Sequence, residues 1–109
     1  MQQNNEFLEE FNYIISLFEI YEKLLTEKQS QYFKYYYYDN YSLSEIAQFL
    51  EVSKNAIHDT INKVSKNLKQ YEEKLNIYKN KITRISLIEK LPLEIQNLKQ
   101  VKEIRKLDE

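Results

Sequence analysis

The residues with the most evident chemical use lie between positions 53 and 69, where polar and basic side chains recur every three or four residues. Asn can read adenine and Lys can read guanine in a DNA major groove, and an ammonium group also suits a phosphate. On a helix, this spacing places the side chains on one face. The sequence therefore predicts a nucleic-acid-binding surface, with duplex DNA as the leading ligand and RNA as a further one, made of Ser53, Lys54, Asn55, His58, Asp59, Asn62, Lys63, Lys66 and Lys69.

Charge is distributed unevenly along the chain, although the formal net charge is only -1. Residues 1–53 contain three Lys against nine Asp or Glu, whereas residues 54–90 contain nine Lys or Arg against four Asp or Glu. The basic part begins at the predicted surface, where phosphate contacts supply most of the affinity that does not depend on sequence.

Three features weigh against DNA as the ligand. Residues 54–68 contain no Arg, which is the commonest reader of guanine. Asp59 would bring a negative charge to the groove, where it needs a cytosine amino group or a neighbouring Lys. Glu51 lies in the turn, and a left-handed backbone at that residue would cost about 1–2 kcal/mol. The alternative function is therefore a protein-interaction adaptor built on the same helical scaffold.

Catalysis has few candidate residues. The chain has no Cys and no Gly, so it has neither a thiol nucleophile nor a glycine-rich phosphate loop. Its single His, His58, has no second His or acidic cluster at metal-ligand spacing, apart from the adjacent Asp59. We therefore predict that the protein is not an enzyme and needs no metal or cofactor.

Two short helices joined by a tight turn, over about residues 42–68, would position the predicted surface. Apolar residues recur there at three- and four-residue spacing, as helices with one buried face require. The residues of the two stripes are Ile46, Ala47 and Leu50 in the first helix, and Ile57, Ile61, Val64 and Leu68 in the second. This pattern predicts a helix-turn-helix motif.

Both helix starts of the motif carry capping residues. Ser42 and Glu45 have the Ser-x-x-Glu spacing of a capping box, and Ser53 is in place to cap the second helix. Val52 lies in the turn, where we expect it to fill the angle between the helices. The boundaries of the motif are therefore the best-defined boundaries in the chain.

Helices are also predicted on both sides of the motif. The first extends over about Glu6–Leu25, and the second begins at the capping box of Thr26 and ends at Tyr37 or Tyr38. The stripe of the motif's second helix continues at the same spacing to about residues 88–91, which predicts one long helix. A last helix follows Pro92. The expected fold class is all-α: a single domain over 1–109, with the long helix and the last helix forming an extension over about 69–109.

The long apolar stripe also allows a prediction of the oligomeric state. It extends from Leu68 to Ile85, and the last helix has an apolar face of its own. One N-terminal helix offers too little surface to cover both, so the sequence predicts a homodimer.

A run of aromatic residues precedes the motif, from Tyr32 to Tyr38. Such a run could stack the bases of single-stranded RNA, or it could pack in a core with the phenol oxygens reaching solvent. Packing is the usual role of an aromatic stripe at helical spacing, so it is the prediction here. The residues expected in the core are Tyr32, Phe33, Tyr36 and Tyr37.

Several segments carry a resemblance to known proteins. They are Leu25–Gln29, Tyr41–Ala47, and Val52–Ser53 followed by Ala56, Ile57 and Asp59. The motif as a whole resembles the tetrahelical helix-turn-helix of sigma-factor region 4. Within that class, roughly the first three quarters of the chain resemble the YlxM family of small helix-turn-helix proteins.

The resemblance implies a sigma region 4-like helical bundle and a regulatory role. YlxM proteins are associated with signal recognition particle genes, which implies components of that particle as partners. The alternatives of a protein adaptor in that system, or of a binder of its RNA, therefore stay open. No apolar run is long enough to cross a bilayer, so we expect a cytoplasmic protein without membrane insertion.

Overall fold

The computed structural model describes the backbone of residues 2–109 and the side chains from Asn5 onward, and within them every regular element is helical. The elements are α1 (Gln2–Tyr21), the 3₁₀ helix η1 (Glu22–Leu24), α2 (Glu27–Tyr37), α3 (Leu43–Leu50), α4 (Lys54–Leu75), α5 (Ile77–Glu89), α6 (Leu93–Gln96) and α7 (Lys99–Lys106). The predicted all-α helix-turn-helix fold is confirmed. The chain forms two compact units, an N-terminal unit that ends at Leu75 and a C-terminal unit that begins at Asn76.

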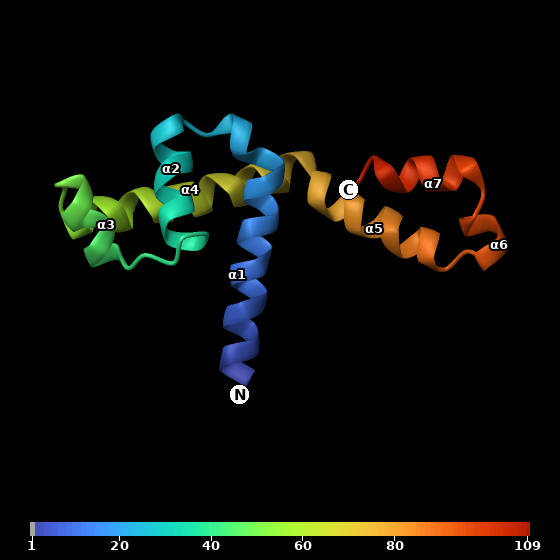
Figure 1. Cartoon of the computed structure of the whole chain (residues 1–109), viewed down its shortest axis with the longest axis horizontal. Helices are drawn as coiled ribbons and strands as arrows, with labels where there is room; N and C mark the ends of the chain where they lie inside the picture. Colours follow the sequence, from blue (N-terminus) through green and yellow to red (C-terminus); the bar gives the residue numbers. More distant parts are fainter. Residues whose placement is uncertain (1) are drawn as a thin grey trace. The chain divides into compact units, whose positions relative to one another are not determined.

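Helix α4 is the centre of the N-terminal unit. Helices α1, α2 and α3 all contact it, and α2 also contacts α3 (Figure 1). One stripe of α4 is buried by these contacts, and its apolar members are Ile57, Ile61, Val64 and Leu68. This is the stripe that the sequence predicts, so hydrophobic burial on one side fixes which side of α4 faces solvent.

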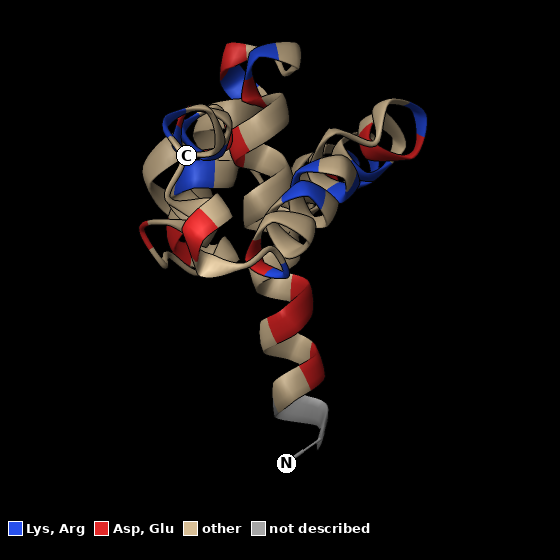
Figure 2. Cartoon of the chain, turned by 90° about the vertical axis from the view of Figure 1, so that its right-hand side faces the viewer, with Lys and Arg blue, Asp and Glu red and all other residues tan. Residues whose placement is uncertain are grey.

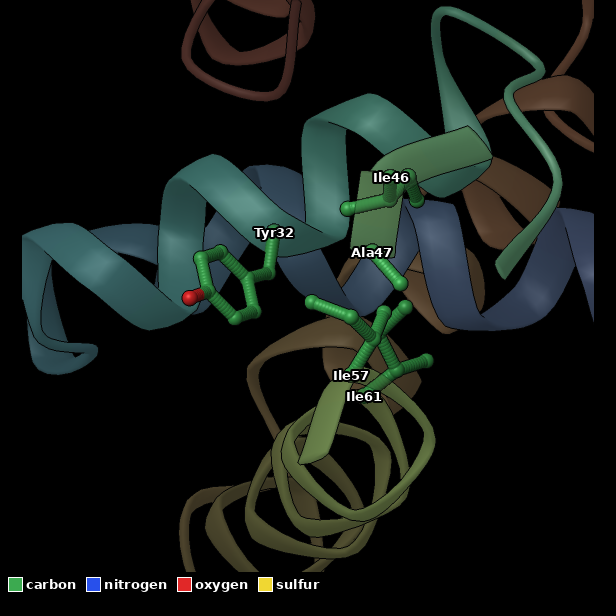
Figure 3. Close-up of a cluster of buried hydrophobic side chains, with 5 residues drawn as sticks. All are labelled: Tyr32, Ile46, Ala47, Ile57 and Ile61. Carbon is green, nitrogen blue, oxygen red and sulfur yellow. The ribbon is translucent and has the colours of Figure 1, made fainter. Parts of the chain in front are cut away.

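A cluster of buried side chains joins α2, α3 and α4. Tyr32 of α2, Ile46 and Ala47 of α3, and Ile57 and Ile61 of α4 converge on one another (Figure 3). Ile46 and Ile57 are fully buried. The two helices of the motif are thus held at a fixed angle by the residues that their apolar stripes predict.

Aromatic rings connect α1 to α2. The rings of Phe18 and Phe33 are stacked with centroids 4.2 Å apart, and Tyr37 stacks on Phe33 at 4.3 Å. Within the aromatic run, Tyr32 and Phe33 are buried, Tyr36 and Tyr37 are half-buried, and Tyr38 is 46% exposed. The predicted core position is confirmed for Tyr32 and Phe33, whereas Tyr36 and Tyr37 are only partly buried, at the edge of the core.

A buried polar contact also joins α1 to α4. The hydroxyl of Tyr21 donates a hydrogen bond of 2.7 Å to the Oε1 atom of Glu72, and both side chains are buried. A buried carboxylate is costly unless it accepts hydrogen bonds, so this contact fixes how α1 and α4 pair. No local pattern in the sequence predicts this contact, because the two residues are 51 positions apart.

The prediction of one long helix after the motif is wrong. Helix α4 ends at Leu75, and Asn76 has a left-handed backbone with φ 54° and ψ 29°. Asn tolerates this conformation better than most residues, which allows the helix to stop although the apolar spacing continues. The apolar stripe is divided in consequence, with Leu68 buried in the N-terminal unit and Ile82 exposed in the C-terminal unit.

Three smaller predictions are also wrong. The single last helix expected after Pro92 is divided into α6 and α7, because Leu98 between them has an extended backbone with φ -62° and ψ 142°. The first helix ends at Tyr21 and does not continue to Leu25. The 3₁₀ helix η1 follows it. Val52 is 39% exposed and does not fill the angle of the motif, because the cluster around Ile46 and Ile57 already occupies it.

The C-terminal unit has little core of its own. Ile88 is the only buried hydrophobic residue that the structure describes in it. Polar contacts hold it together: Arg84 donates two hydrogen bonds, of 2.9 and 2.7 Å, to the carboxylate of Asp108, and its guanidinium holds the pKa of that carboxyl below its usual value. The large apolar side chains left exposed are Ile77, Ile82, Leu87, Leu91, Leu93, Ile95, Leu98, Ile104 and Leu107.

The turn of the motif contains a strained residue. Glu51 has φ 58° and ψ 41°, and its backbone N–H closes the end of α3 on the carbonyls of Ala47 and Gln48. Replacing Glu51 by Gly removes the clash of Cβ with the backbone, which costs about 1–2 kcal/mol in this conformation. Because Gly also loses more entropy on folding, we expect the free energy of unfolding to rise by about 0.5–1 kcal/mol.

Urea denaturation measures this effect as a higher midpoint with an unchanged m-value. Gln48→Gly, at an exposed helical position of α3, is the control and should instead lower stability by about 1 kcal/mol. A loss of stability in Glu51→Gly comparable to that of the control would contradict the strain at residue 51.

Candidate nucleic-acid interface

The turn between α3 and α4 positions the start of the predicted surface. The Oγ atom of Ser42 accepts from the Glu45 N–H at 3.1 Å and the Glu45 carboxylate accepts from the Ser42 N–H at 3.1 Å, so the predicted capping box is present. The Oγ atom of Ser53 accepts from the Ala56 N–H at 3.0 Å. These caps satisfy backbone N–H groups at both helix starts and place Lys54 in the first turn of α4.

All nine predicted residues are exposed and share the solvent side of the motif's second helix and its cap. Asn55, His58 and Asn62 follow one another at three- and four-residue spacing, and so lie on one face of α4. The buried stripe that contains Ile57 and Ile61 lies on the opposite side. The structure therefore brings the predicted residues together on an accessible helix face.

Side chains on this face contact one another. The Asn62 amide nitrogen lies 3.4 Å from Nδ1 and 3.3 Å from Nε2 of His58. Nδ1 of His58 also lies 3.8 Å from Oδ1 of Asp59, whose side chain is 83% exposed. The partner of Asp59 is thus His58, not a neighbouring Lys, and its charge is open to solvent at the middle of the face.

The three Lys residues further along α4 differ in their surroundings. Lys63 and Lys66 are exposed, and no ion pair of either is formed with the residues whose side chains the structure describes. Lys69 instead forms an ion pair with Glu10 of α1, with both side chains about half exposed. Lys63 and Lys66 are therefore directly available to a phosphate, whereas Lys69 would have to exchange its partner.

Helix α2 packs against α4 close to these Lys residues. The Tyr37 hydroxyl hydrogen-bonds with Ser65, next to Lys66. Burial raises the pKa of the Tyr37 phenol, the charges of Tyr36 and Glu10 raise it further, and Ser65 and Lys69 oppose them. The phenol is consequently neutral at physiological pH and acts as a structural support. Nothing in the sequence of the aromatic run predicted the contact between Tyr37 and Ser65.

The part of the chain that the structure describes holds neither a cluster of metal ligands nor a candidate membrane span. No three His, Cys, Asp or Glu side chains there come close enough to hold a metal ion. No helix there has both the length and the apolar character that a membrane span requires.

The known proteins that this chain resembles are helix-turn-helix proteins, as the motif predicts. The family UPF0122, described as "Putative helix-turn-helix protein, YlxM / p13 like", matches residues 8–108. A UPF0122 protein of Lactococcus lactis subsp. cremoris is 40% identical over 106 residues, which cover 94% of this chain and 96% of the relative. One from Mycoplasma capricolum is 42% identical over 108 residues, covering 95% and 96%.

A third relative, a UPF0122 protein of Streptococcus gordonii, is 43% identical over 84 residues, which cover 77% of this chain and 76% of the relative. These similarities extend well beyond the motif itself and confirm the resemblance to the YlxM family. The chain belongs to the UPF0122 family of YlxM/p13-like helix-turn-helix proteins.

Proposed function

We propose that the protein is a non-catalytic regulatory protein that binds nucleic acid, with α4 entering the major groove of duplex DNA. The observation that carries this proposal is the two-sided character of α4: its apolar stripe is buried in the unit, and the predicted reading residues are exposed on the opposite side. Such a helix can approach a groove without any change in the fold that supports it.

The residues of α4 divide into two roles in this proposal. Lys54, Asn55 and His58 lie in its first turns, where the second helix of a helix-turn-helix reaches base edges. Lys63 and Lys66 lie further along, where their exposed ammonium groups would contact the phosphate backbone. Affinity would come mainly from Lys63 and Lys66, and sequence preference from Lys54, Asn55 and His58.

One observation favours a different ligand. Asp59 stands open to solvent in the middle of the face, and the phosphates of a duplex repel such a charge. A protein of the signal recognition particle system is therefore the second candidate ligand. The RNA of that particle, whose phosphates Asp59 also repels, is tested beside duplex DNA below. The adaptor role requires the same face to bind a protein after nucleic acids have been removed.

We also propose a homodimer. It is supported by the nine large apolar side chains that the C-terminal unit leaves exposed, because exposed apolar surface of this kind often marks a protein interface. Two copies would present two α4 helices, and a dimeric helix-turn-helix protein reads two half-sites of a palindromic sequence.

Fluorescence anisotropy at several salt concentrations tests the nucleic-acid proposal. Labelled random duplex DNA and a labelled RNA hairpin are each titrated with the protein. For duplex DNA we expect the logarithm of the binding constant to fall linearly with the logarithm of salt concentration, with a slope of about -0.9 for each neutralised phosphate.

The two probes separate the candidates. Tighter binding of the RNA hairpin than of duplex DNA would replace DNA by RNA as the ligand. If folded protein binds neither probe at low salt, the nucleic-acid proposal fails, and capture of a protein partner from nuclease-treated lysate would then support the adaptor.

A further inference from the structure

An apolar groove lies on the N-terminal unit, away from the predicted residues of α4. It has a volume of about 420 Å³, and its apolar walls are Phe7, Leu8 and Phe11 of α1, Tyr36 of α2, and Tyr41 before α3. Phe7 is 66% exposed and Leu8 is 53% exposed. Two large apolar side chains left open beside a groove indicate a surface that a partner covers.

The surroundings of the groove are acidic. Glu45 lines it, and the part of α1 that forms its wall carries Glu6 and Glu9, whereas Glu10 there is paired with Lys69. Figure 2 shows acidic residues along this part of α1. The whole N-terminal unit has 8 Lys or Arg against 12 Asp or Glu, a net charge of -4. The groove therefore suits a ligand that is apolar and basic.

The C-terminal unit of the chain has this chemistry. It contains 8 Lys or Arg against 5 Asp or Glu, a net charge of +3. Helix α7 combines the two properties, because Ile104 is 45% exposed and Leu107, just after the helix, is 84% exposed. The basic residues on the helix are Lys99, Lys102, Arg105 and Lys106.

Both surfaces lack cover. A helical unit of 34 residues with a single buried hydrophobic residue is too small to be stable by its own core. The exposed apolar residues proposed for the contact are Ile104 and Leu107 on one surface and Phe7 and Leu8 on the other. Each copy has both surfaces, so a two-fold dimer would form the contact twice.

We propose that α7 of one copy docks in the Phe7–Leu8–Phe11 groove of a second copy, and that the second copy's α7 occupies the groove of the first. This deepens the proposed homodimer and rests on it. Ile104 and Leu107 enter the groove, and the basic residues of α7 face the acidic residues of α1. The interface is isologous, so each contact occurs twice.

Two substitutions with matched controls test the two surfaces. Leu8→Asp damages the groove, and Leu24→Asp changes a residue of equal exposure, 53%, in the 3₁₀ helix η1 that follows α1. Ile104→Asp damages α7, and Ile82→Asp changes a residue of equal exposure, 45%, on α5. All four positions are exposed, so circular dichroism should show helical content like that of the unmodified protein.

Sedimentation at tens of micromolar then reports the assembly. We expect the unmodified protein and both controls to be dimers, and Leu8→Asp and Ile104→Asp to self-associate at least tenfold more weakly. An equimolar mixture of the two damaged variants should recover dimers. In the mixed dimer, the intact α7 of the Leu8→Asp chain meets the intact groove of the Ile104→Asp chain.

Each contrary result identifies which part of the proposal is wrong. If the unmodified protein is a monomer, both the homodimer and this docking are wrong. If it is a dimer that Leu8→Asp or Ile104→Asp leaves intact, the homodimer stands and the docking surface is wrong. If both variants are monomers and their mixture does not recover dimers, the reciprocal exchange of α7 is wrong.

Discussion

Replacing Phe33 by Ala is expected to lower the free energy of unfolding of the N-terminal unit by about 3–5 kcal/mol. The ring is fully buried and stacks on Phe18 on one side and on Tyr37 on the other, at 4.2 and 4.3 Å between centroids. Its removal leaves a cavity between α1 and α2 and loses both stacking contacts. Since small domains are stable by only about 5–15 kcal/mol, this change removes a large part of the total.

Phe49→Ala is the matched control, because it makes the same chemical change in an exposed ring. Phe49 is 46% exposed and makes edge-to-face contacts with Tyr35 at 5.1 Å and Tyr41 at 5.2 Å. It should cost only about 0.5–1.5 kcal/mol, the usual worth of aromatic pairing. Thermal unfolding followed by circular dichroism measures both. Equal losses in the two variants would show that the Phe18–Phe33–Tyr37 stack is not central to stability.

Replacing Lys63 and Lys66 together by Ala is expected to weaken the proposed binding to every duplex DNA by a similar factor. Both ammonium groups are exposed on the face of α4 that would meet the phosphates. Losing two phosphate contacts should reduce the slope of the logarithm of the binding constant against the logarithm of salt concentration by about 2. The affinity at about 0.1 M salt should fall on the order of tenfold to a hundredfold. Anisotropy titrations with several duplexes measure both quantities.

The control for this pair is Lys23→Ala with Lys28→Ala. It removes the same total charge from exposed residues of the N-terminal unit that lie outside α4. A general effect of charge would weaken binding equally in both double variants, whereas a phosphate contact on α4 affects only the first. If the two double variants retain the same affinity and the same salt slope, α4 is not the binding helix.

Local signals in the sequence predicted much of the fold. The side chains of Thr26, Ser42 and Ser53 satisfy free N–H groups of the residues that follow them, so the starts of α2, α3 and α4 could be located from neighbours in sequence. Apolar spacing predicted which stripe of α4 is buried and thereby which face is open. The exposed surface of the motif follows from these two facts, so its nine residues could be named without a structure.

Contacts between residues distant in sequence could not be predicted in this way. Tyr21 and Glu72 are 51 positions apart, and neither residue carries a local sign that it becomes a buried hydrogen-bond partner. The pairing of Lys69 with Glu10 depends on how α1 crosses α4. Periodicity also failed at Asn76, because one left-handed residue can end a helix while the apolar spacing continues beyond it.

The placement of the tyrosines gives the protein an optical property. The chain has ten Tyr and no Trp, and all but one Tyr, Tyr78, lie before residue 76. Near-ultraviolet circular dichroism and intrinsic fluorescence therefore report almost entirely on the N-terminal unit, whereas far-ultraviolet circular dichroism records the helices of both units. A difference between the two melting curves would thus directly measure how independently the units unfold.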